Sequence, residues 1–340
     1  MKIWYSVQST GLGHLVPYRT LGSALLKYNH ELITLTSGPD LLSFFKPLGN
    51  KHFHLKGPTL IVNKDRLSYS KTALYNVIHL PEFIINFLKL KKWMEIEKPD
   101  LVIVDYEPFT SNYLRITKPA IPSFSVDHQS TFISPMFPFP KLDWILKVIT
   151  QIFTYAKVRL CSSLLDYGRE GAFICIPPIL REEVLNMETG DDGSVLVYHS
   201  SATASNKEEI KKVCPGDRKF IFYGYEFENY KNLTFKPKGE EFLQDLAKCH
   251  VYITNCGFFS VCEALVLGKR MICQPLKGHT EQEWNGRILK AFPNVKVVDN
   301  IDYQNLEIER LSIPDPEKTQ WLRQGLEHAL QYILEDQKVS

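Results

Sequence analysis

The stretch from Val251 to Gly286 constrains the fold of this chain more than any other part of the sequence. It consists, in order, of a short apolar run, a turn around Gly257, an amphipathic segment, a second apolar run, a polar loop and a second amphipathic segment. This order predicts a parallel strand–helix–strand unit whose helices begin at one edge of the sheet. Helix N-termini offer free N–H groups and a positive dipole end, which suit phosphate groups. The stretch is therefore either a sugar-nucleotide pocket or an ordinary core unit of an α/β fold.

The N-terminus shows the same pattern. Lys2–Gln8 and Glu31–Thr36 are predicted strands, and a glycine-containing turn and a predicted helix, Leu15–Tyr28, lie between them. Gly13 and His14 lie in the turn at the carboxyl end of the first strand, where open α/β sheets bind ligands. A helix N-terminus favours the neutral form of a histidine, which suits a general base. The alternative is a helix-capping histidine without chemistry.

Polar residues also follow two later predicted strands of the N-terminal half. Asp105 ends the predicted buried strand Pro99–Asp105, on the same sheet edge as His14. A carboxylate there could accept the imidazole N–H, fix its tautomer and stabilise the imidazolium that proton abstraction forms. Three further residues near this edge, which are candidates for the acceptor side of a site, are Glu107, Asp127 and His128. For Glu107 the alternative is the first turn of the next helix.

Length and composition limit the class of protein. At 340 residues the chain is long enough for two domains. No apolar run is long enough to span a membrane, no signal peptide is visible, and seven scattered cysteines without a CxxC pair favour reduced thiols over disulfides. We therefore expect a cytoplasmic protein.

Charge is unevenly distributed along the chain. Residues 1–170 hold 20 Lys and Arg against 13 Asp and Glu, a net charge of +7, whereas residues 171–340 hold 20 against 25, a net charge of −5. A basic–aromatic cluster, Lys89, Lys91, Lys92 and Trp93, ends a predicted helical region at 72–98. It either contacts a membrane surface or an acidic acceptor, or is a solvated helix face. Peripheral contact with the inner membrane face stays open, and nothing predicts nucleic-acid binding.

Several catalytic motifs are absent from the sequence. There is no DxD-type acidic pair, no His/Cys cluster with metal-ligand spacing, no GxxxxGK[ST] and no GxSxG, so we expect no metal and no cofactor. The charge of a diphosphate would then be balanced by helix N-termini and by hydroxyls such as that of Ser260. Glu263, three residues later on the same predicted helix, either holds two ribose hydroxyls or is a capping or surface acid.

Three motifs resemble those of a known family. They are STGLGHLVP, the pair PDLVIVDYEPF and IPSFSVDHQS, and TNCGFFSVCEALVLGKRMICQPLKGHTEQEWNG. The chain is similar to GT-B-fold glycosyltransferases, close to the UDP-glycosyltransferases and the peptidoglycan N-acetylglucosaminyltransferase. The resemblance spans nearly the whole chain. It implies an α/β fold of two facing Rossmann-like, doubly wound domains with a central cleft.

The resemblance also assigns roles to residues. His14 matches the family's catalytic base and Asp105 its acidic partner. Further residues match the donor-binding loops or lie next to matching positions: Gly13, His199, Ser200, Ser201, Asn255, Cys256, Gly257, Phe258, Ser260, Glu263, Glu281, Gln282 and Asn285. The sequence departs from the family pattern at Asn255-Cys256, at the bulky Phe258 and at Glu281, where many relatives have Asp.

The expected domains follow from the Pro-Pro pair at 177–178 and from the resemblance. We expect an acceptor-binding domain at 1–178, a linker at 179–193, a nucleotide-sugar-binding domain at 194–315 and a C-terminal helix at 316–340 that packs toward the N-domain. The resemblance implies inverting, metal-independent transfer of a sugar, from UDP by preference, to a hydroxyl of a glycan, a lipid-linked or a small-molecule acceptor. The alternatives are a sugar-nucleotide hydrolase and a non-catalytic sugar-nucleotide- or glycan-binding protein on the same fold.

Overall fold

The computed structural model divides into two compact units. Unit 1 comprises residues 1–61, 67–181 and 324–340, and unit 2 comprises residues 62–66 and 182–323. The structure describes residues 1–9, 12–38, 45–59, 61–63, 66–138, 144–199, 210, 217–225, 227–237, 239, 241–312 and 316–335. None of the helices in these ranges is long and apolar enough to cross a bilayer.

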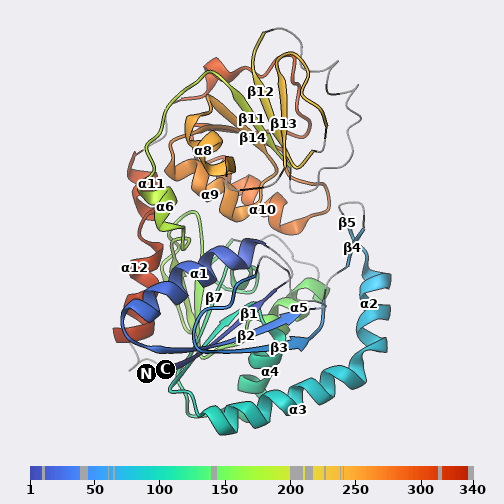
Figure 1. Ribbon diagram of the computed structural model, residues 1–340, viewed down its shortest axis with the longest axis vertical. Coiled ribbons are helices and arrows are strands. Elements are labelled where there is room, and N and C mark those ends of the chain that lie inside the picture. Colours follow the sequence, from blue (N-terminus) through green and yellow to red (C-terminus); the bar gives the residue numbers. More distant parts are fainter. Residues whose placement is uncertain are drawn as a thin grey trace. The chain divides into compact units, whose positions relative to one another are not determined.

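Unit 1 is built on one large sheet (Figure 1). Its described strands lie in the order β3-β2-β1-β6-β7-β8-β10-β9, and all pairs are parallel except β9 with β10. The strands are β1 (Lys2–Gln8), β2 (Glu31–Gly38), β3 (Lys51–Lys56), β6 (Leu101–Asp105), β7 (Ser123–Asp127), β8 (Val158–Ser162), β9 (Arg169–Glu170) and β10 (Phe173–Ile176). Two short strands, β4 (Val62–Asn63) and β5 (Arg66–Leu67), form a separate two-stranded sheet, and residues 62–66 belong to unit 2. The strand order of the large sheet reverses between β1 and β6, as in doubly wound folds.

Helices cover both faces of this sheet because its side chains alternate between two apolar cores. Ile3, Tyr5 and Val7 point into a core that also contains side chains of α1 (Leu12–Lys27) and α12 (Gly325–Leu330). Trp4 points into the opposite core, with side chains of α3 (Leu80–Glu97) and α4 (Pro108–Thr117). The other helical elements of unit 1 are α2 (Tyr69–Ile78), η1 (Gln129–Phe132), α5 (Trp144–Phe153) and η3 (Gln331–Glu335).

Unit 2 repeats the architecture with a fully parallel sheet in the order β13-β12-β11-β14-β15-β16. Its strands are β11 (Val195–Tyr198), β12 (Phe220–Tyr223), β13 (Leu233–Lys236), β14 (Val251–Thr254), β15 (Arg270–Cys273) and β16 (Val295–Val297). Its described helices are α6 (Glu182–Leu185), α8 (Glu241–Lys248), α9 (Phe258–Val266), α10 (Thr280–Leu289), η2 (Ile308–Arg310) and α11 (Pro316–Leu322). The predicted α/β class with two doubly wound units is therefore confirmed.

Some predicted elements differ from the observed ones. The sequence analysis missed β8 and β13, which are short and mix polar with apolar residues. The single helix expected from residue 316 is two helices, because the chain passes from unit 2 to unit 1 between α11 and α12. At this junction, a Cβ on Gly325 would lie 2.1 Å from the carbonyl oxygen of Pro178, so only glycine allows this close approach.

Candidate active site

The predicted dyad of unit 1 lies where the strand order of the sheet reverses. His14 is in the first turn of α1, which follows β1, and Asp105 is the last residue of β6. The Nδ1–H of His14 donates to Oδ1 of Asp105 over 2.7 Å. The His14 side chain is 17% exposed and that of Asp105 is 1% exposed, so the pair has a buried carboxylate and a ring that solvent reaches. The structure thus brings these two residues together at the expected sheet edge.

The carboxylate of Asp105 has few partners besides His14. Burial raises its pKa, and the charge and hydrogen bond of His14 act in the opposite direction. Among the described residues, its Oδ2 is buried and accepts no hydrogen bond, and the buried Tyr5 hydroxyl is likewise unpartnered. The pKa of Tyr5 is raised, first by burial and then by the charge of Asp105. A positive charge on His14 is therefore the main stabilising influence on an ionised Asp105.

The sequence analysis did not single out Tyr106, which orients the dyad from a second direction. Its ring stacks on that of His14 with centroids 5.4 Å apart and an interplanar angle of 5°, and it packs against Phe153 at 4.8 Å. Tyr106 has a φ of 51°, in the left-handed region. For a non-glycine residue this conformation costs about 1–2 kcal/mol and is common at functional sites. In the sequence, the one indication of this role is that an aromatic residue, Tyr106, directly follows the acid at the end of a predicted strand.

The three acceptor-side candidates lie at the same edge but point into the unit. Both Oε atoms of Glu107 accept backbone N–H groups at the start of α4, at 2.9 and 2.7 Å. Asp127 accepts hydrogen bonds from the N–H and hydroxyl of Ser130, and His128 Nδ1 donates to the carbonyl of Ser162. Burial raises the pKa of Asp127 to about 6. These side chains support the edge that carries the dyad, and their contact with an acceptor stays a prediction.

In unit 2 the strand order reverses between β11 and β14, and the predicted donor residues follow these two strands. His199 comes directly after β11, and burial lowers its pKa to about 4, so the ring is neutral at pH 7. Gly257 is the N-cap of α9, and the Ser260 hydroxyl in its first turn donates to the carbonyl of Gly257 over 3.2 Å. Ser200 and Ser201 lie outside the described residues, whereas Gly13 of unit 1 is exposed in the first turn of α1.

Three predicted donor residues shape the loops at this edge. Asn255 Nδ2 donates to the carbonyl of Gln274, and Asn285 Nδ2 donates to the carbonyl of Cys256, each over 3.0 Å. Gln282 Oε1 accepts the N–H of Leu276, also at 3.0 Å. These amides tie the turn after β14 to the loop after β15, which holds the N-terminus of α9 in place.

The remaining donor candidates differ in their accessibility. Cys256 and Phe258 are buried, and Glu281 is partly exposed in the first turn of α10. Glu263 is only 2% exposed, so contact between its carboxylate and a ribose requires movement around it. His279, which the sequence analysis did not consider, is the N-cap of α10, and its Nδ1 accepts the N–H of Gln282.

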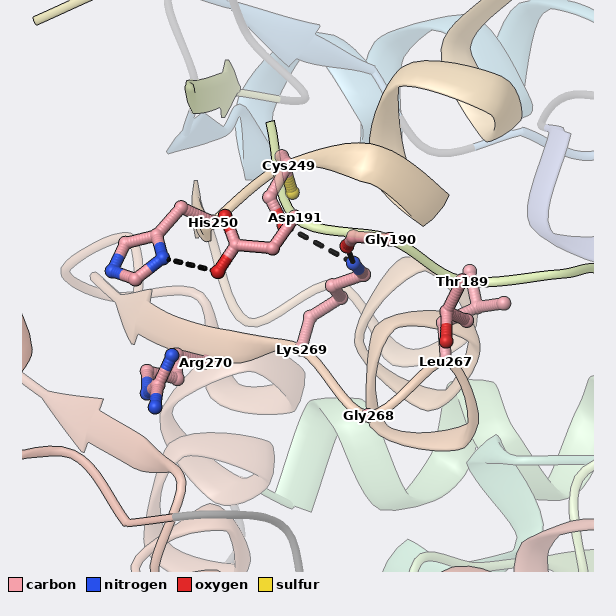
Figure 2. Close-up of a pocket in the computed structure, with 9 residues that line it drawn as sticks. All are labelled: Thr189, Gly190, Asp191, Cys249, His250, Leu267, Gly268, Lys269 and Arg270. Atoms are coloured by element: carbon pink, nitrogen blue, oxygen red, sulfur yellow. Dashed lines mark hydrogen bonds and ion pairs between the residues drawn. The ribbon is translucent and has the colours of Figure 1, made fainter. Parts of the chain in front are cut away.

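A cavity of about 390 Å³ lies at the opposite edge of the unit 2 sheet, by the amino ends of β14 and β15. Figure 2 shows His250 and Asp191 pointing toward one another and Lys269 reaching toward Gly190. His250 Nδ1 and Asp191 Oδ2 are 2.7 Å apart, and Lys269 Nζ donates to the carbonyls of Gly190 and Cys249 at 2.7 and 3.1 Å. No predicted site residue lines this cavity, and these contacts attach the segment around Gly190 to the sheet of unit 2.

Within the described ranges, no group of three or more His, Cys, Asp and Glu side chains could hold a metal ion. The six cysteines in these ranges are buried and form no disulfide.

Comparison with known proteins identifies the family. A family model described as Glycosyl transferase family 1 matches residues 1–313. A search of curated proteins gave no significant match. The fold is similar to the glycotransferase of kitacinnamycin, with a TM-score of 0.68 and 15% identity over 99% of this chain and 98% of that one.

Two further solved structures share the fold. The quercetin complex of Arabidopsis thaliana UGT89C1 has a TM-score of 0.62 and 16% identity, over 98% of this chain and 95% of that one. Acinetobacter baumannii MurG has a TM-score of 0.59 and 13% identity, over 98% and 99%. The chain therefore belongs to glycosyl transferase family 1 and is a glycosyltransferase with the GT-B fold.

Proposed function

We propose that this glycosyltransferase moves a sugar from a UDP-sugar to an acceptor hydroxyl, with inversion at the anomeric carbon and without a metal ion. The observation that carries the proposal is the 2.7 Å hydrogen bond between His14 and the buried Asp105. Asp105 engages Nδ1 of the imidazole, so Nε2 is the nitrogen that would receive a proton from an acceptor. A histidine held in this way is suited to act as a general base.

The proposed reaction is a single displacement. His14 takes the proton of the acceptor hydroxyl, the acceptor oxygen forms a bond to the anomeric carbon, and the bond from that carbon to the diphosphate oxygen breaks. The proton remains on His14 as imidazolium, which the charge of Asp105 stabilises. One in-line displacement inverts the configuration at the anomeric carbon, and the nucleoside diphosphate leaves with the electron pair.

Unit 2 supplies the proposed donor site. The N–H groups at the start of α9 and the Ser260 hydroxyl are the groups that would balance the charge of the leaving diphosphate. Support for uridine comes from UGT89C1, whose solved structures include complexes with UDP and with UDP-L-rhamnose. The proposal that transfer needs no metal ion rests on this role of the helix N-terminus, whose N–H groups would balance the diphosphate charge.

The acceptor is proposed as a class. UGT89C1 was solved with quercetin, and Phytolacca americana UGT2 with pterostilbene and UDP-2fluoro-glucose. These complexes support an acceptor that offers a hydroxyl group, and a glycan, a lipid-linked or a small-molecule alcohol fits the proposed chemistry equally.

The test is transfer from a panel of UDP-sugars to a panel of hydroxyl compounds, with EDTA present. We expect UDP release that depends on the acceptor. We also expect a product whose configuration at the anomeric carbon is inverted relative to the donor. His14→Ala should abolish transfer while the donor still raises Tm, because the proposed donor groups lie on unit 2. His30→Ala, which removes another histidine of unit 1, is the matched control. Full activity of His14→Ala would refute the general-base role, and free sugar formed at a rate that no acceptor raises would identify a hydrolase instead.

A further inference from the structure

The basic–aromatic cluster at the end of α3 does not form a common surface. The ring of Trp93 stacks on Phe53 at 4.3 Å and belongs to a core of unit 1. Lys89, Lys91 and Lys92 are exposed. The aromatic residue therefore points inward, and any surface role of this segment depends on other apolar side chains.

Such side chains are present on α2 and α3, in an arrangement that is unusual for a water-exposed surface. Between residues 74 and 88, seven large aliphatic residues are between 53% and 68% exposed: Leu74, Val77, Ile78, Leu80, Ile84, Ile85 and Leu88. We call this set the α2–α3 face. Solvent-facing sides of helices are normally polar, and extended exposed apolar areas mark interaction sites.

Helical spacing places the members of this face on one side of each helix. On α3 the residues from Leu80 to Leu88 recur at intervals of four, one and three, on the side opposite to Phe83, Leu90 and Met94, which are buried in the core. On α2, Leu74, Val77 and Ile78 are spaced at intervals of three residues and then one, and they lie on the side opposite to the buried Thr72. Figure 1 shows α2 and α3 as successive helices at the periphery of unit 1. Because α3 already packs through its other side, the core does not explain its outward aliphatic residues.

The charges around the face are mainly positive. Lys71 lies on α2, and Lys89, Lys91 and Lys92 follow the aliphatic residues of α3; all four are exposed. Within the part of the chain that the structure describes, no carboxylate pairs with any of them. By contrast, the nearby Glu82 and Glu97 pair with lysines of β3. The face is therefore apolar in its middle and cationic at its end.

We propose that the α2–α3 face binds the surface of an anionic lipid bilayer, with α3 lying in the interfacial plane. Exposed aliphatic side chains next to lysines suit this environment, since the aliphatic groups enter the acyl boundary and the ammonium groups meet lipid phosphates. The set lacks Trp, Tyr and Arg, which dominate the energetic centres of protein interfaces. This inference is independent of the proposed sugar transfer.

Co-sedimentation of the full chain with vesicles tests the inference. We expect binding to vesicles of phosphatidylcholine with 30 mol% phosphatidylglycerol, weaker binding to phosphatidylcholine alone, and weaker binding in 0.5 M NaCl. Ile84→Asp/Ile85→Asp should lower the partition coefficient by at least about tenfold, because charges replace two aliphatic groups that would enter the acyl boundary. Lys91→Gln/Lys92→Gln should lower it by about fivefold for each lysine, on anionic vesicles only.

Tyr28→Asp provides a matched control, because it introduces the same charge at a 60% exposed residue outside the face. Circular dichroism and Tm of each variant establish that it is folded. The proposal is overturned if the folded wild-type chain binds no vesicle, or if the Ile84/Ile85 variant binds as the wild type does. It is also overturned if wild type is a dimer that these substitutions dissociate and that does not bind vesicles, because the face would then be covered by a second copy.

Discussion

Substitution of Asp105 by Asn tests the central assignment most sharply. The change keeps the shape of the side chain and an oxygen that can accept the Nδ1–H of His14, now 2.7 Å away. It removes the negative charge beside the imidazole. If His14 becomes an imidazolium as the acceptor loses its proton, the negative charge of Asp105 stabilises the transition state much more than it stabilises the resting enzyme.

The size of the effect follows from Coulomb's law. Two unit charges roughly 4 Å apart interact by about 4 kcal/mol at an effective dielectric constant of about 20, which corresponds to about a thousandfold in rate. The retained amide oxygen preserves part of the orientation of the ring. We therefore expect kcat to fall by about 10²- to 10³-fold.

Stability should respond in the opposite direction. Because burial raises the pKa of Asp105, ionisation of this carboxyl is disfavoured by desolvation. A neutral amide avoids this desolvation, so Tm at pH 7 should stay constant or rise while activity falls. Loss of activity through unfolding would lower both.

The assay is steady-state transfer with donor affinity measured separately by calorimetry. Asp100→Asn is the matched control, because Asp100 lies just before the other end of β6 and accepts the backbone N–H of Lys2. We expect kcat to fall only in Asp105→Asn, with unchanged donor affinity in both variants. A wild-type kcat in Asp105→Asn would refute the role of this carboxylate, whatever the activity of His14 variants.

Three further predictions concern stability. The pKa of Asp127 is raised from 3.8 to about 6. The contribution of this carboxyl to the unfolding free energy is therefore fully present below pH 3.8 and is lost as the pH rises through about 6. Between about pH 4 and 7 this effect should lower the unfolding free energy of the wild type by roughly 3 kcal/mol. Asp127→Asn should abolish this pH-dependent decrease, as measured by urea unfolding. Lys269→Met leaves two carbonyls without their ammonium donor and should lower the unfolding free energy by roughly 2 kcal/mol in the same assay. Gly325→Ala places a Cβ 2.1 Å from a backbone oxygen and should destabilise by roughly 2–3 kcal/mol, whereas Gly190→Ala, with nothing within 4 Å of its Cβ, should have little effect. Equal stability of the two alanine variants would contradict the steric argument.

The strands most accurately predicted were those with a simple local cause. β1 was predicted with its observed bounds, because it is a run of largely buried residues that ends at a turn. Parallel pairing then fixes which ends of the strands share an edge. The proximity of His14 and Asp105 followed from this geometry, although 91 residues separate them in the sequence.

Other features depend on packing that local sequence does not encode. The left-handed backbone of Tyr106 is stable only because the neighbouring strand end and Phe153 hold its ring against His14. The inward orientation of Trp93 likewise depends on Phe53 of β3. Residue type alone made Trp93 a surface candidate, whereas the exposed residues of α3 are aliphatic ones that a sequence pattern assigns to a core.

The amides of unit 2 show why site residues and framework residues look alike in sequence. Gln282 and Asn285 were expected to meet the donor sugar, and the structure shows each holding a backbone group of a loop at the sheet edge. An amide has both donors and an acceptor, so one group can hold a loop while another remains for a ligand. Their predicted contact with a sugar therefore needs ligand-bound geometry, which no sequence pattern supplies.

The cavity beside Lys269 and the direction of the strands favour different edges of the unit 2 sheet as a ligand site. It lies at the amino ends of β14 and β15, whereas open parallel sheets bind ligands beyond the carboxyl ends, at the point where the strand order reverses. Polar groups of this cavity already have partners, because His250 contacts Asp191 and Lys269 donates to two carbonyls. At the other edge, α9 begins at a glycine whose missing side chain leaves the helix N–H groups uncapped by its own residue. Helix N-termini favour phosphate groups, which supports the proposed donor site at the carboxyl edge rather than at the cavity.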